Sequence, residues 1–185
     1  MSGAGPLLSV RGLRVSFALD EGMVRAVDGA GFDVDEGQVV GIVGESGCGK
    51  SVTMRAILRL VDKPGRIDGG EILFRRDGGM VDLARLRADD PLLRQIRGGE
   101  IALIPQEPMA AFSPVHTVGE QIVEAILLHA HRWDGGMDRR RAREAAIGLF
   151  RDVGISMPEQ RIDAYSWQLS GGMRQRAMIA MALSC

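Results

Sequence analysis

The chain has 185 residues, of which 45% are hydrophobic and 25% are charged, so it can bury a core and a disordered chain is not expected. Its 23 basic and 24 acidic residues give a net charge of −1, which argues against a nucleic-acid binder driven by bulk charge. The longest apolar runs are much shorter than the roughly 20 residues of a membrane-spanning helix, the N-terminus lacks the pattern of a secretory signal, and two cysteines far apart in sequence favour a reducing compartment over a disulfide framework.

The first half of the chain has the pattern of strands around one helix. Residues 8–17 and 24–34 are β-rich and partly alternating, and the turn-like "LDEG" joins them, which predicts an antiparallel pair. The run "QVVGIVG" at 38–44 is almost wholly apolar and predicts a strand buried on both faces in a parallel sheet. A helix from Lys50 to Leu60 should follow, and "DGGEILFRRDGGMVDL" predicts two more strands around Gly78 and Gly79.

The second half changes from strand to helix. Asp90 and Pro91 predict the cap and first position of a brief helix, and "EIALIPQ" at 100–106 predicts another buried strand. Helical patterns then cover 118–131 and 139–153, followed by a polar link and a last helix headed by "LSGG". We therefore predict an α/β fold in two parts: a core with a β lobe over residues 1–106 and a mostly helical part over 107–185.

The stretch "GESGCGKS" matches G-x-x-x-x-G-K-[ST] at Gly44, Gly49, Lys50 and Ser51, between a predicted strand and a predicted helix. Glycines let the backbone curl so that several N–H groups converge on phosphate oxygens at the positive end of the helix. Lys50 would reach the β and γ phosphates, and Ser51 would hold Mg²⁺. A Gly-rich turn with an exposed lysine is the alternative, but the strand–loop–helix context favours a nucleoside triphosphate site.

One residue of that loop, Cys48, has two interpretations. A thiol near a helix N-terminus can be reactive, which raises the hypothesis of redox control. A small side chain that points away from the phosphate explains the residue equally well.

A second phosphate site is indicated by "LSGGMRQR". Ser170 and the amides of Gly171 and Gly172 head a helix, where an anion is stabilised. Ser170 as a helix cap followed by two turn glycines is a sound alternative, and both interpretations can hold together.

These motifs occur in the order found in ABC-type ATPases. The stretches "VGESGCGKS", "IPQEPMAAFSPVHTVGEQI" and "YSWQLSGGMRQRAMIAMAL" resemble the ATP-binding subunit of a bacterial dipeptide or oligopeptide (peptide/nickel-type) ABC importer, over essentially the whole chain. The resemblance implies a P-loop NTPase fold with an antiparallel β lobe and a helical subdomain. Met173 departs from the glutamine common at its position, a change that this branch tolerates. The stretch "AAFSPV" also departs from the usual pattern, and it weakens any inference about the transported substrate.

The resemblance also implies a role for each site residue, with ATP and Mg²⁺ as the ligands. Phe17 would stack on adenine, and Lys50 and Gln106 would be the catalytic residues. Ser51 and Gln106 would ligate Mg²⁺, and Gln106 would also hold the attacking water. The three residues Ser170, Gly171 and Gly172 would contact the γ-phosphate of ATP held by the opposite subunit. The loop that holds the phosphates comprises Gly44, Glu45, Ser46, Gly47, Cys48, Gly49, Lys50, Ser51 and Val52.

The partners implied by the resemblance are a second, homologous ATP-binding subunit forming a heterodimer, two membrane permease subunits and, indirectly, an extracytoplasmic solute-binding protein. The subunit would lie on the cytoplasmic face of the inner membrane and contact no nucleic acid. Two other functions share many of these residues: a truncated, non-catalytic nucleotide-binding module that pairs with an intact subunit, and a soluble ABC ATPase of DNA maintenance.

In the family, the helix after "LSGG" leads into an apolar strand ending in Asp-Glu and then to a loop with a histidine, whereas the sequence stops at Cys185. We therefore expect that the C-terminal part of the core is missing and that apolar surface is exposed. We also expect the 185-residue chain alone to be poorly soluble or partly unfolded, and inactive in hydrolysis, because it lacks the groups that activate the triphosphate.

Overall fold

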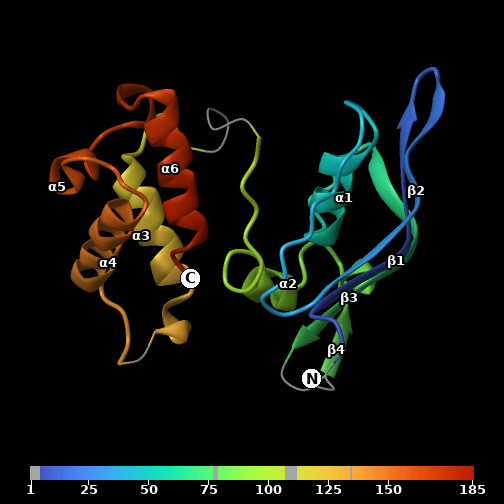
Figure 1. Cartoon of the computed structure of the whole chain (residues 1–185), viewed down its shortest axis with the longest axis horizontal. Helices are drawn as coiled ribbons and strands as arrows, with labels where there is room; N and C mark the ends of the chain where they lie inside the picture. The colour runs from blue at the N-terminus through green and yellow to red at the C-terminus, as the bar shows by residue number, and fades with distance from the viewer. Residues whose placement is uncertain (1–4, 77–78, 107–111, 134) are drawn as a thin grey trace. The chain divides into compact units, whose positions relative to one another are not determined.

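A computed structural model describes residues 5–76, 79–106, 112–133 and 135–185 (Figure 1). The chain forms two compact units, residues 1–93 and residues 94–185. The first unit combines an antiparallel sheet with a helix, and the second is mainly helical, so the predicted α/β character is confirmed. In the sequence, the boundary between the units follows residue 93, whereas the sequence pattern suggested a boundary after residue 106.

The sheet of the first unit has four antiparallel strands in the order β2-β1-β3-β4. The strands are β1 (Leu8–Leu19), β2 (Gly22–Val34), β3 (Gly65–Arg76) and β4 (Gly79–Asp82). The pairing of Leu19 with Gly22 confirms the predicted hairpin at "LDEG". Leu13, Val15 and Ile72 are fully buried, which places the core of this unit along β1 and β3.

One helix, α1 (Lys50–Ile57), lies between β2 and β3 in the chain and contacts both β1 and β2. It buries Thr53, Ala56 and Ile57. The helix ends three residues before the predicted Leu60, because Arg59 takes a left-handed conformation with φ of 55°. The α1 helix thus connects the residues just before it, 44–49, to the unit that contains the sheet.

Two short helices follow the sheet: η1 (Leu83–Arg85) and α2 (Pro91–Ile96). The Asp90 carboxylate accepts a hydrogen bond from the Leu92 N–H at 2.8 Å. This contact confirms Asp90 and Pro91 as the start of a helix.

The two strands predicted as buried, 38–44 and 100–106, are wrong for this structure. Neither segment forms a β-strand in the described residues. The second makes only an isolated β-bridge, between Arg97 and Ile101. Val39 is 96% exposed and Val43 is 93% exposed. An apolar run becomes a buried strand only where neighbouring strands pair with it and cover it, and in the described residues no strand does so. The expected exposure of apolar surface is seen here.

The second unit packs its helices around a core of aliphatic and aromatic residues, including Ile122, Ile126 and Phe150. The predicted helices at 118–131, at 139–153 and after "LSGG" are confirmed, the first ending earlier, at 128. The elements are α3 (Val118–Leu128), η3 (Ala130–Arg132), α4 (Arg139–Asp152), α5 (Pro158–Arg161), η4 (Ser166–Gln168) and α6 (Gly171–Ala182).

Gly119 allows the start of α3 to lie close to the backbone at Ile162. A Cβ at Gly119 would lie 2.4 Å from the carbonyl oxygen of Ile162. The N–H groups of Val118 and Gly119 donate to the carbonyls of Ala164 and Ile162, each at 2.9 Å. The start of α3 is thereby fixed to the chain that leads to α6.

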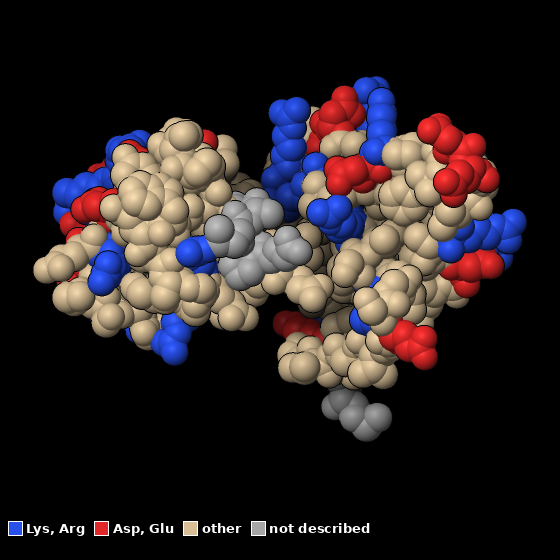
Figure 2. All heavy atoms as spheres, turned by 90° about the horizontal axis from the view of Figure 1, so that it is seen from above, with Lys and Arg blue, Asp and Glu red and all other residues tan. Residues whose placement is uncertain are grey.

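Among the described helices, none has the length and apolar character needed to span a membrane. Basic and acidic side chains lie intermixed on the face shown in Figure 2.

Candidate functional site

The predicted phosphate loop, Gly44 to Ser51, leads directly into α1. Gly47 and Gly49 have φ of 83° and 90°, which side chains with a Cβ rarely adopt. A Cβ at Gly49 would also lie 2.2 Å from the carbonyl oxygen of Ala26 in β2. The glycines of the motif therefore have a structural cause: the loop curls tightly and touches the backbone of β2.

The Lys50 ammonium group lies within the curl of the loop. Its Nζ donates to the carbonyl oxygens of Gly44 and Glu45, each at 2.7 Å, and lies 3.4 Å from the Sγ of Cys48. The ammonium group thus binds neutral carbonyls at a helix N-terminus. An anion at this position would attract it more strongly than those carbonyls do.

The groups of this loop fit a Mg²⁺–phosphate ligand. The amide N–H groups in the first turn of α1 form the positive end of the helix. Lys50 adds a positive charge there. The Ser51 side chain is exposed at the first turn of α1 and offers a hydroxyl oxygen, the kind of ligand that Mg²⁺ accepts. Glu45 and Ser46 are exposed and Val52 is half-buried.

A cavity of about 590 Å³ adjoins the loop. Cys48, Lys50 and Thr53 line it, together with residues 26–32 and 40–43. The loop therefore opens into a space within the same unit.

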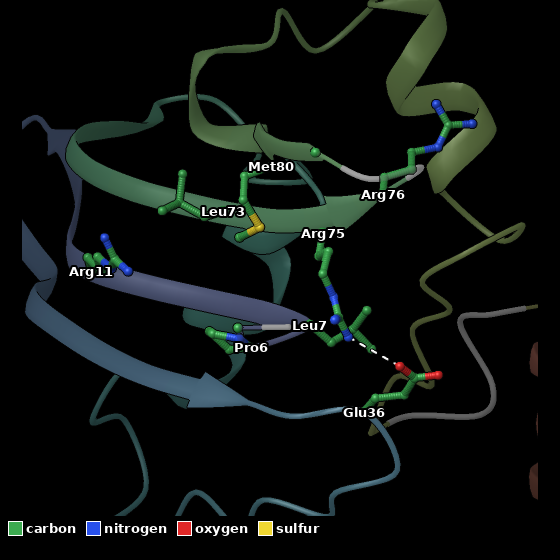
Figure 3. Close-up of a pocket in the computed structure, with 10 residues that line it drawn as sticks. Pro6, Leu7, Arg11, Glu36, Leu73, Arg75, Arg76 and Met80 are labelled. Atoms are coloured by element: carbon green, nitrogen blue, oxygen red, sulfur yellow. Dashed lines mark hydrogen bonds and ion pairs between the residues drawn. The ribbon is translucent and has the colours of Figure 1, made fainter. Parts of the chain in front are cut away.

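A second cavity, of about 880 Å³, is lined by none of the phosphate-loop residues. Leu7, Leu73 and Met80 lie against it, and an ion pair of 3.2 Å joins Arg75 to Glu36 at its rim (Figure 3). This cavity is separate from the candidate site.

Phe17 lies near the end of β1, in the same unit as the loop, and is half-buried. A Cβ at Gly65 of the neighbouring strand β3 would lie 2.5 Å from Cε1 of the Phe17 ring, so the ring packs against Gly65. Stacking of this ring on adenine stays a prediction.

The second predicted phosphate site is the N-terminus of α6. The Ser170 hydroxyl accepts a hydrogen bond from the Met173 N–H at 3.3 Å, so the helix cap is confirmed. Gly171 and Gly172 are exposed, and apart from the flanking residues and the backbone of α6 itself, no described heavy atom lies within 4 Å of the Cβ position of either. Contact of these glycines with a γ-phosphate stays a prediction.

Gln106 is exposed at the end of the extended segment that follows α2. It belongs to the second unit, as do Ser170 to Gly172, whereas Phe17 and the phosphate loop belong to the first. The rest of the "IPQEP" motif, from Glu107, lies outside the described residues.

Sequence reasoning missed the side chains that orient the α6 terminus. Arg174 Nε donates to the Leu169 carbonyl at 2.8 Å. Arg176 Nη1 donates to the carbonyls of Val153 and Gly154 at 3.0 and 2.8 Å, which are the free acceptors at the end of α4. A glycine after a helix indicates that the helix ends there with free carbonyls, but no local pattern identifies Arg176 as the group that satisfies them.

Comparison with known proteins decides the family. The family model described as "ABC transporter" matches residues 27–185. The chain belongs to the ABC transporter family. The model's match begins within β2 and runs through both units of this ABC-type chain, and it includes both predicted phosphate loops.

Curated relatives lie in the peptide-transport branch. The chain is 47% identical over 180 residues to "Probable peptide ABC transporter ATP-binding protein y4tR" of Sinorhizobium fredii, covering 97% of this chain and 50% of that protein. It is 45% identical over 179 residues to "Dipeptide transport ATP-binding protein DppD" of Escherichia coli, covering 97% and 51%. The chain thus spans about half the length of these relatives.

A solved ABC cassette supports the fold. The structure described as the dimeric, post-hydrolysis state of "the ATP-binding cassette MJ0796 bound to ADP and Pi" aligns with a TM-score of 0.78 and 25% identity, covering 96% of this chain and 69% of that one. The fold is therefore that of a P-loop ABC ATPase.

Proposed function

We propose that this chain binds MgATP and that, in the complete subunit, ATP hydrolysis drives the import of peptides. The observation that carries the proposal is the position of Lys50, whose ammonium group lies 2.7 Å from two carbonyls inside a glycine-curled loop at a helix N-terminus. The two curated relatives named above support the transport role, because both are named as peptide or dipeptide transport ATP-binding proteins.

In this proposal the amides of the loop, from Gly44 to Val52, and the Lys50 ammonium bind the phosphates. Ser51 and Gln106 would hold Mg²⁺, which when bound would neutralise phosphate charge. Gln106 would also orient the attacking water, and Phe17 would stack on adenine. Lys50 would move from the Gly44 and Glu45 carbonyls to the β and γ phosphates, so that a cation–anion contact replaces two neutral acceptors.

The α6 terminus would act on a second nucleotide. Ser170, Gly171 and Gly172 are exposed, and Arg174 donates to the carbonyl of the residue before them, Leu169. We propose that they contact the γ-phosphate of ATP held by a homologous partner subunit, forming a heterodimer. The dimeric state of the MJ0796 cassette supports a paired arrangement.

The complete subunit would lie on the cytoplasmic face of the inner membrane. There it would bind two permease subunits and, through them, serve an extracytoplasmic solute-binding protein. We also propose that function divides the chain at Gln106: residues 1–106 form the ATP-binding core, and residues 107–185 form the helical subdomain. Neither a DNA-maintenance ATPase nor a non-catalytic module gains support from the two curated relatives.

The test is equilibrium binding of MgATP to the chain and to Lys50→Ala, measured by calorimetry. Lys63→Ala is the matched control, because Lys63 is the other lysine of the chain and is exposed. We expect binding to the parent and to the control and a loss of binding in Lys50→Ala. Equal affinity in all three proteins would overturn the phosphate-loop assignment.

Turnover by the complete subunit with its permeases tests the transport role. ATP hydrolysis stimulated by a peptide-loaded binding protein supports it. Tight binding of ATP without turnover in the complete assembly would favour the non-catalytic module instead.

A further inference from the structure

A buried histidine of the second unit packs against a glycine turn. His129 is the residue at which α3 ends, and its side chain is 8% exposed. A Cβ at Gly99 would lie 2.9 Å from its Nδ1, and a Cβ at Gly98 would lie 3.2 Å from its Nε2. The ring can occupy this position because both residues of the turn lack a side chain.

The polar surroundings of His129 disfavour its cation. Nδ1 is buried and has no hydrogen-bond partner among the described residues. Burial lowers the pKa of His129 below its ordinary value of 6.5, and the nearby His131 and Arg132 charges lower it further, while a hydrogen bond with the Arg97 backbone raises it. The carboxylate on this side, Glu100, is paired with Arg132 at 3.7 Å.

The turn that His129 contacts is the start of the segment that ends at Gln106. The N–H groups of Glu100 and Ile101 both donate to the Ile96 carbonyl at 2.9 Å, and the Gly98 N–H donates to the Ile101 carbonyl at 2.9 Å. Residues 102–105 beyond the turn have no regular secondary structure. These four residues are all that separates the turn at 96–101 from Gln106.

We propose that His129 is a positioning residue for the Gln106 segment, and that its neutral imidazole holds the 96–101 turn against α3 whereas its protonated form releases it. The link to hydrolysis rests on the proposed function, because Gln106 acts on nucleotide in that proposal alone. The link between His129 and the turn stands on the packing of the ring against Gly98 and Gly99.

The direction with pH follows from the charge balance. A second proton on the ring would place a buried cation beside His131 and Arg132, with Nδ1 as a donor that has no acceptor among the described residues. The hydrogen bond with the Arg97 backbone favours the cation but does not outweigh these costs. The open turn, where the ring is solvated, binds that proton at about pH 6.5. The turn is thus fully held above this pH, and it opens as the pH falls from about 6.5 toward the lower pKa of the closed state.

The test is amide hydrogen exchange of the whole chain between pH 7.5 and 5.5, read as protection factors at Gly98, Glu100 and Ile101, together with a proton NMR titration of the ring. We expect the opening equilibrium of the turn to rise by roughly tenfold for each pH unit within the window. His129→Gln should remove the pH dependence, and His131→Gln, which changes an exposed histidine two residues away, should retain it.

A turn whose protection does not change with pH in the parent chain, or a His129 that titrates at or above 6.5, would overturn the proposal even if His129→Gln fails to fold. Binding of MgATP, measured on the same samples, separates the two proposals. Binding with a pH-independent turn refutes the positioning role alone, and a pH-dependent turn without binding refutes the ATP site alone. In the complete subunit, kcat should fall on acidification more than KM changes, and His129→Gln should flatten that profile.

Discussion

Two glycine-rich loops stand at helix N-termini in this chain, and they are built differently. At the phosphate loop, Gly49 has a φ of 90° and touches the backbone of β2, and Lys50 lies within the curl. At the α6 terminus, neither Gly171 nor Gly172 has a positive φ or a neighbour within 4 Å of its Cβ position. The first loop is tightly curled, lies against β2 at Gly49 and carries its own cation, whereas the second presents exposed N–H groups without a cation of its own in the curl.

We infer from this difference that the two glycine-rich loops contact phosphate in different ways. A curled loop that carries a cation at a helix N-terminus can hold a phosphate by itself. A helix N-terminus without such a cation binds an anion more weakly. It can still contribute when another site already holds the ligand next to it. The comparison predicts that substitutions in the first loop change nucleotide binding in the chain alone, and at Gly49 also folding. Substitutions in the second loop should change function mainly in a dimer.

The largest effect should come from Gly49→Ala. The new Cβ would clash with the Ala26 carbonyl at 2.2 Å and would force a left-handed backbone on alanine. Strain of this kind costs about 1–3 kcal/mol before the clash is counted. We expect a lower melting temperature and no measurable MgATP binding. Gly172→Ala is the matched control, and equal losses in both variants would remove the contrast between the loops.

Lys50→Ala should leave the fold intact and remove binding. A hydrogen bond to a charged group contributes about 1.5–3 kcal/mol, which corresponds to roughly a 10- to 150-fold change in affinity. Calorimetry with MgATP checks the loss, and thermal melting checks the fold. A large fall in the melting temperature would mean that Lys50 is structural and that its contacts with Gly44 and Glu45 hold the loop.

Ser170→Ala should destabilise the second unit by about 1 kcal/mol, because it removes the cap of α6. The affinity of the isolated chain for MgATP should not change, since the phosphate loop does not involve this residue. Urea unfolding and calorimetry measure the two quantities. A loss of ATP affinity in the isolated chain would show that the second loop takes part in binding within one chain.

The smallest effect should come from an ion pair that joins α4 to the segment between α5 and η4. Arg143 binds the Asp163 carboxylate with two hydrogen bonds, at 2.8 and 2.7 Å. The Arg143 guanidinium lowers the pKa of Asp163 below 3.8, so the pair stabilises the fold above that pH and its contribution is lost as the pH falls through the lower folded-state pKa.

Asp163→Asn should therefore reduce stability at pH 7 by about 0.2–1 kcal/mol, the range of exposed ion pairs. Its stability should also vary less with pH in the acid range than that of the parent. Urea unfolding at pH 7 and at pH 3 measures both effects. A variant as acid-sensitive as the parent would show that other carboxylates dominate the response.

Motifs with a local cause were predictable from the sequence. The curl at Gly49, the cap at Ser170 and the helix start at Asp90 and Pro91 each depend on a few adjacent residues, and the structure has them as predicted. The strands at 38–44 and 100–106 were not predictable in the same way. Their apolar patterns are those of buried strands, but burial depends on neighbours that no local pattern contains.

Contacts between distant residues were also beyond sequence reasoning. The hydrogen bonds of Arg176 with the end of α4 join residues 22 and 23 positions apart. The packing of His129 on Gly98 and Gly99 likewise joins α3 to a turn some 30 residues earlier in the chain. Neither contact follows from spacing, because both depend on how the helices of the second unit pack.

The central claim is that the phosphate loop binds nucleotide by itself and the α6 terminus does not. The most direct test is the change in amide NMR shifts of the chain on addition of MgATP. We predict large shifts at residues 47–51 and none at residues 170–173 in the monomer. Shifts at residues 170–173 without shifts at residues 47–51 would contradict the claim, as would equal shifts at both loops.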